Sequence, residues 1–111
     1  MSDHMTQIDF GDLPDDMTEG FWVYHQENPD VFDRLVELSE SLVSRGRTRI
    51  GMSMLFEILR WEYFMAVDTA EPFKLNNNYR AYYTRLIEKK VPELRGVFTK
   101  RQSVSDSAVA A

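Results

Sequence analysis

Three segments of the chain carry apolar residues at the spacing of an α-helix, and residues that end helices separate them. Asn28 and Pro29 precede the first segment, where asparagine can accept bonds from free backbone amides and proline suits the first helical position. Gly46 follows this segment, and Pro92 follows the third. We expect helices at about residues 29–45, 50–65 and 77–90. The pattern predicts a mainly all-α fold, a three-helix core with short flanking elements.

The second segment is apolar on nearly all sides, and such a helix is usually central and buried. Its main apolar stripe consists of Met54, Ile58, Trp61 and Met65, and Leu55 and Leu59 lie beside this stripe. Phe56, Tyr63 and Phe64 fall on the opposite side of the helix. Residues 63–67 are also compatible with a strand. Glu62 lies near the main stripe, where an unpaired carboxylate is costly. We expect Arg80 or Arg49 to pair with it, unless it points to solvent.

The connector between the second and third helices is about ten residues long, which exceeds the tight turn of the simplest helix-turn-helix motif. A short β-hairpin in this connector would suit a winged-helix variant. The pattern is therefore compatible with a relative of either motif.

The domain organisation follows from the ends of the chain, which has 111 residues. Residues 1–20 are acidic and contain Gly11, Pro14 and Gly20, so we expect a flexible arm that Ile8, Phe10 and Leu13 can attach to the body. Residues 21–101 are expected to form a single helical domain, and residues 102–111 a disordered tail. The run at residues 21–24 fits a short strand or a first helical turn.

Charge is distributed unevenly along the chain, whose net charge is −5. Residues 1–44 carry eleven acidic residues and one basic residue, whereas residues 45–101 carry twelve basic and six acidic residues. Such asymmetry indicates a surface that faces a polyanion. Packing of acidic against basic faces, or an effect on solubility alone, would produce the same pattern.

The third helix and the residues before it carry the side chains best suited to nucleic acid. Asparagine can bond the adenine edge and arginine the guanine edge, and a recognition helix uses its exposed N-terminal positions for this. We expect Tyr79, Tyr82, Tyr83, Leu86 and Ile87 to face inward and Asn77, Arg80, Ala81, Thr84, Arg85 and Glu88 to face outward. The predicted base contacts are Asn77, Arg80, Ala81 and Thr84. The predicted phosphate contacts are Lys74, Arg85, Lys89, Arg45, Arg47 and Arg49.

Each of these signals has a structural alternative. An asparagine of the run at residues 76–78 can cap the helix, and another can adopt left-handed geometry in the turn before it. The three arginines of residues 45–49 can be solvated, or can cap the acidic helix before them.

Catalytic and metal-binding chemistry has little support in the sequence. The chain has two histidines and no cysteine, and it contains no nucleophile elbow, P-loop or zinc-protease motif. We therefore expect no enzyme, no metal site and no cofactor. Without eighteen consecutive apolar residues we expect no membrane span, and without cysteine or a secretion signal we expect a cytoplasmic location.

The run Phe73-Lys74-Leu75-Asn76-Asn77-Asn78-Tyr79, with Tyr83 and Arg85 after it and residues 56–61 before it, resembles small phage- and prophage-encoded helical proteins. These proteins are mostly uncharacterised, and the likeness covers about residues 21–101. It implies a phage or mobile-element setting and transfers no catalytic residue. We expect a non-enzymatic DNA-binding protein, and the modest core favours a homodimer. The alternative is a protein-interaction module that binds or inhibits a host protein through the acidic arm.

Overall fold

The computed structural model describes residues 10, 13, 15–68 and 73–99. Their helices are α2 (Asp15–Glu27), α3 (Pro29–Ser44), α4 (Met52–Ala66) and α5 (Arg80–Lys90), with short 3-10 turns η1 (Asn77–Tyr79) and η2 (Pro92–Leu94) on either side of α5. Within these ranges the only β pairing is an isolated parallel bridge between Ile50 and Phe98. The mainly all-α prediction is confirmed. The likeness to helix-turn-helix proteins stays a prediction.

Helix α5 supplies much of the core. Its Tyr82, Tyr83, Leu86 and Ile87 are almost completely buried, as the sequence predicted. Phe21 of α2 packs on this face, with its ring centroid 4.8 Å from that of Tyr83 and 5.1 Å from that of Tyr82. Helices α3 and α4 add further core side chains, which include Val31, Leu35, Leu55, Phe56 and Leu59. None of the helices in the described ranges is long and apolar enough to cross a membrane.

Helix α2 begins earlier than the sequence indicated. Residues 15–20 are helical, so the expectation of an irregular arm over residues 1–20 is wrong for this part, and residues 21–24 form helix and not strand. Gly20 lies inside the helix, where a Cβ atom would meet the Tyr79 hydroxyl at 3.0 Å. Phe10 is buried against Phe21 and Tyr82, and Leu13 packs on the same core. Both therefore attach the arm as predicted, while Ile8 lies outside the described residues.

Helix α3 has the expected bounds, with one difference at its start. Pro29 is the first helical residue, but the Asn28 side chain does not cap α3. Instead, its Nδ2 donates to the Tyr24 carbonyl, 3.0 Å away, and so closes α2. At the other end Gly46 has φ of +92°, a backbone geometry that glycine adopts without steric cost.

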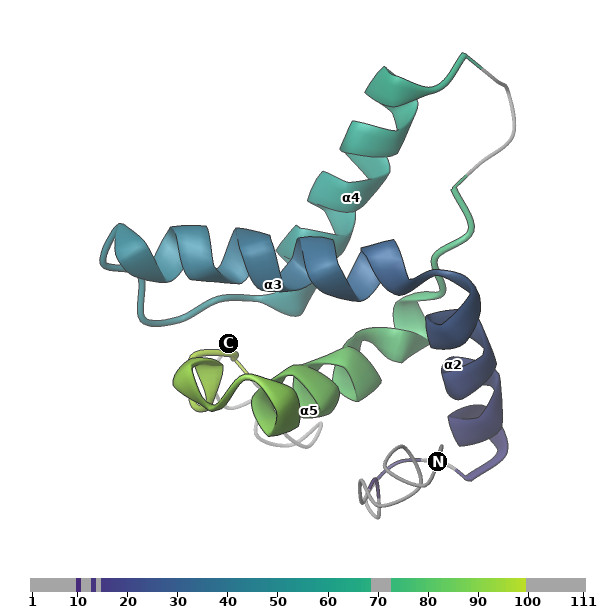
Figure 1. Cartoon of the computed structure of the whole chain (residues 1–111), viewed down its shortest axis with the longest axis horizontal. Coiled ribbons are helices and arrows are strands. Elements are labelled where there is room, and N and C mark those ends of the chain that lie inside the picture. Colours follow the sequence, from purple (N-terminus) through teal and green to yellow (C-terminus); the bar gives the residue numbers. More distant parts are fainter. Residues whose placement is uncertain (1–9, 11–12, 14, 69–72, 100–111) are drawn as a thin grey trace, which may run out of the picture.

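Helix α4 is not buried on all sides, so the sequence expectation is wrong. Its N-terminal part packs through Met52, Leu55 and Phe56, and Figure 1 shows that its C-terminal part projects away from the other helices. Much of the predicted main stripe is exposed, with Met54, Trp61 and Met65 each 47% exposed or more. The helix continues to Ala66, so the alternative of a strand at residues 63–67 is also wrong.

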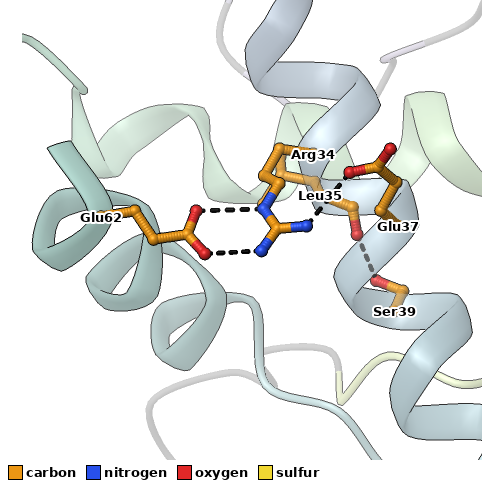
Figure 2. Close-up of polar contacts among 5 residues, drawn as sticks. All are labelled: Arg34, Leu35, Glu37, Ser39 and Glu62. Carbon is orange, nitrogen blue, oxygen red and sulfur yellow. Dashed lines mark hydrogen bonds and ion pairs between the residues drawn. The ribbon is translucent and has the colours of Figure 1, made fainter. Parts of the chain in front are cut away.

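A bidentate ion pair joins α3 to the projecting part of α4. Arg34 donates to Glu62 from Nε at 3.0 Å and from Nη2 at 2.6 Å, and its Nη1 donates to Glu37 at 3.1 Å (Figure 2). The partner of Glu62 is therefore Arg34 and neither Arg80 nor Arg49, because α3 crosses α4 at this level. Hydrogen bonds from Arg34 lower the pKa of Glu62. The pair stabilises the fold above about pH 4.5 and loses this effect as the pH falls further.

The C-terminal segment folds back onto the core. Leu94 and Phe98 are buried, and Val97 packs on the core. The Ile50 amide donates to the Val97 carbonyl and the Thr99 amide donates to the Ile50 carbonyl, each at 2.9 Å. These two bonds fix the segment beside the loop between α3 and α4.

Candidate nucleic-acid interface

The asparagines of residues 76–78 serve the fold first. Asn76 accepts a bond from the Asn78 amide at 2.8 Å and caps η1. Asn77 Oδ1 accepts from Arg60 Nη2 at 2.6 Å. The capping alternative is confirmed for Asn76, and the amide oxygen of Asn77 is occupied within the chain.

Arg60 is the residue that organises this segment, and the sequence reading missed it. Besides Asn77, its guanidinium donates to the Leu75 carbonyl at 2.8 Å and to Glu57 at 2.6 Å. The guanidinium carbon also lies 5.9 Å from the centre of the Phe56 ring. These contacts hold residues 75–77 against α4. Only the Glu57–Arg60 pair, three residues apart on one helix, was visible in the sequence.

The expected outward face of α5 is only partly outward. Thr84 and Glu88 are buried, so both expectations are wrong. Thr84 Oγ1 donates to the Arg80 carbonyl at 2.9 Å, and Glu88 accepts from the Gly96 amide at 3.2 Å because the chain after η2 folds over the end of α5. Arg80 donates to Ser53 at 2.6 Å and to the Asn77 carbonyl at 2.9 Å, while Arg85 donates to the Ala81 carbonyl at 3.2 Å.

The remaining predicted residues fall at two ends of the molecule. Lys74 lies on the N-terminal side of α5, where it lines a shallow hollow with Tyr24, Leu75, Asn76 and Tyr79. Arg45, Arg47 and Arg49 are exposed in the loop between α3 and α4, on the side of the C-terminal segment. The structure therefore separates Lys74 from the three loop arginines.

Three segments of the chain that carry exposed basic residues meet where the loop between α3 and α4 pairs with the C-terminal segment. The Ile50–Phe98 bridge places Arg49 beside the segment that contains Arg95, and the Gly96–Glu88 bond places that segment beside Lys89. We call this region the basic end. It comprises Arg45, Arg47, Arg49, Lys89, Lys90 and Arg95, all of which are exposed. Within the described ranges none of the six forms an ion pair with an acidic side chain. The sequence reading did not include Lys90 or Arg95.

A cluster of aromatic groups with buried polar atoms lies between α2 and α5. The hydroxyls of Tyr24 and Tyr83 and the Nδ1 atom of His25 have no hydrogen-bond partner among the described residues. Burial raises the pKa of Tyr24 to about 12 and also raises that of Tyr83. Burial, and then the charge of Lys90, lower the pKa of His25. At pH 7 these groups are therefore in their neutral forms.

The lowered pKa of His25 predicts a loss of stability in mild acid. The unfolded chain binds a proton near pH 6.5 and the folded chain only below that, so the free energy of unfolding should decrease as the pH falls from about 7 to about 5. Urea denaturation at both pH values measures this decrease. In the His25→Gln variant the decrease should be smaller. A His25 pKa at or above 6.5 in an NMR titration would contradict the prediction.

Comparison with models of known protein families, with curated proteins and with solved structures found no match. The resemblance to small phage-encoded proteins stays a prediction. Among the described residues, no group of three or more histidine, aspartate or glutamate side chains is placed to hold a metal ion.

Proposed function

We propose that this chain is a small non-enzymatic protein that binds nucleic acid by contacting phosphate groups with its basic end. The observation that carries the proposal is the pairing of Ile50 with the segment around Phe98, which brings two basic segments of the chain together. Exposed arginine and lysine side chains without acidic partners are the groups that neutralise phosphates and release their counterions.

The distribution of the acidic residues supports an approach of nucleic acid to the basic end. Exposed acidic side chains follow α3 from its start, at Asp30, Asp33, Glu37 and Glu40, and the basic end begins where α3 ends. Charge is thus separated along the length of α3, although the net charge of the chain is negative. A polyanion approaching such a molecule is attracted to one end and repelled from the rest.

We expect little preference for base sequence. Of the predicted base contacts, Asn77, Arg80 and Thr84 already bond within the protein. The fourth, Ala81, has no hydrogen-bonding side chain. Contacts to phosphate oxygens carry no base information directly. The proposal therefore keeps the phosphate-binding part of the sequence hypothesis and moves the interface from the face of α5 to its C-terminal end.

Fluorescence anisotropy with a labelled DNA duplex of random sequence tests the function. If all six cations of the basic end reach phosphates, the logarithm of the binding constant should fall with the logarithm of salt concentration with a slope of about −5. Binding that is absent at low salt, or that does not change between about 50 and 200 mM salt, would exclude the proposal. A second duplex of different sequence should bind equally well.

The alternative, a protein-interaction module that uses the acidic arm, is distinguished by a deletion. Removal of residues 1–9 takes away Asp3 and Asp9 but keeps Phe10, whose side chain is part of the core. Under the present proposal DNA binding is unchanged or stronger in the shortened chain. Loss of capture of a host protein by the same variant would favour the alternative.

A further inference from the structure

The projecting part of α4 exposes large apolar side chains that the other described residues leave uncovered. Trp61 is 63%, Phe64 60% and Met65 68% exposed. Met54, two helical turns before Trp61, is 47% exposed. We call these four the apolar face of α4; Phe64, three residues after Trp61, lies at the edge of this face and not on the opposite side of the helix, as the sequence had indicated. Grouped exposed side chains of this size mark interaction surfaces more often than solitary ones do. We propose that this face is the interface of a homodimer in which α4 of one chain packs against α4 of a second copy.

The spacing of the apolar side chains fits a helix as the partner. Met54, Ile58, Trp61 and Met65 follow one another at intervals of four, three and four residues, which is the repeat of a seam between packed helices. The seam runs from Met54 to Met65 of α4 and so extends over about 16 Å. The opposite side of α4, with Leu55, Phe56 and Leu59, is already filled by the core of its own chain.

The charges of α4 favour an identical chain over a charged partner. The helix contains only three charged residues, and each is paired within the chain: Glu57 with Arg60 at 2.6 Å, and Glu62 with Arg34 at 2.6 Å. Across a two-fold axis each residue meets its own copy or near neighbours, so an unpaired charge would face a like charge. Glu57 lies on the same side of the helix as Met54 and Trp61, and its charge is balanced there by Arg60. The apolar face therefore offers no unpaired charge that would select a charged host protein.

The available area indicates a weak dimer. A large aromatic side chain can bury about 150–250 Å², so the exposed parts of the four side chains and their surroundings provide roughly 500 Å² per protomer. The total of about 1,000 Å² is at the lower limit for specific interfaces. We therefore expect dissociation in the micromolar range. Antiparallel pairing would place the two basic ends, each at the N-terminal side of its α4, at opposite ends of the helix pair.

Sedimentation velocity over about 5 to 200 µM of the full chain tests the proposal, because mass action makes the dimer fraction rise with concentration. Trp61→Glu should weaken association at least tenfold without loss of helical circular dichroism, because Trp61 contributes little to the core. Val23→Glu is the matched control, since Val23 is an exposed apolar residue of α2, and it should leave association unchanged.

Two results would overturn the proposal. A wild-type chain that stays monomeric at the highest concentration excludes the dimer, and if removal of residues 102–111 then restores association, the tail is the occupant of the face. A dimer that Trp61→Glu does not weaken has its interface elsewhere. Neither result depends on nucleic-acid binding, so the two proposals fail independently.

Discussion

Replacing Arg45, Arg47 and Arg49 together with alanine is expected to weaken binding to a DNA duplex by about 10²- to 10³-fold at 50 mM salt, and to reduce the steepness of the salt dependence by about 2.7. The reason is the loss of three phosphate contacts from the basic end. All three side chains are exposed and none forms an ion pair within the described ranges. The variant should therefore keep its fold, which circular dichroism and urea denaturation can check.

A matched pair of single substitutions tests whether DNA binding depends on where a positive charge lies or only on the net charge of the protein. Arg47→Ala and Lys74→Ala each remove one exposed positive charge, but Lys74 lies at the other end of α5. Anisotropy titrations should show that Arg47→Ala reduces the salt slope by about 0.9 and that Lys74→Ala leaves it unchanged. Equal effects of the two substitutions would mean that binding responds to net charge and that the basic end has no special role.

Replacing Phe21 with alanine is expected to destabilise the domain by about 3–5 kcal/mol, the usual range for a buried phenylalanine. Phe21 is fully buried, and its ring contacts those of Phe10, Tyr79, Tyr82 and Tyr83. Because small domains have a total stability of about 5–15 kcal/mol, much of the population should unfold at low urea concentrations. Urea denaturation followed by circular dichroism measures the effect.

Val23→Ala is the control for this substitution, because Val23 is on the exposed side of the same helix. We expect a change within about 0.5 kcal/mol. If Phe21→Ala cost no more than Val23→Ala, α2 would not be docked on α5, and the described position of Phe10 would lose its main support as well.

Local signals in the sequence located three of the helices, because Pro29, Gly46 and Pro92 act on the backbone of their own neighbourhood. Helix α2 was partly missed because it contains Gly20, which lowers helix propensity, and because the contact that favours it is made with residues about 60 positions away. The burial of α4 was overestimated for a related reason. A helix that is apolar all round fits a central position, but it equally fits one packed side and one open side.

The candidate site shows the same limit at the level of single side chains. Residue type correctly indicated that an asparagine of residues 76–78 would act as a cap. It also singled out the three arginines of residues 45–49 as candidate phosphate contacts. It did not indicate that Thr84 and Glu88 would be buried. For Glu88 the reason is the turn after η2, whose Gly96 amide donates to the carboxylate. Nor did residue type indicate that Arg34 would reach Glu62, since the level at which two helices cross is decided by packing.

The Ile50–Phe98 bridge also makes the geometry of the basic end depend on the completeness of folding. The two residues are 48 positions apart, and closing a loop of this length costs chain entropy that local helix formation does not. Contacts of high sequence separation are the slow ones to form. A chain whose helices are made but whose last segment has not docked therefore carries all six cations without holding them together. Tight retention of a polyanion would then report the finished fold and not merely the presence of the charges.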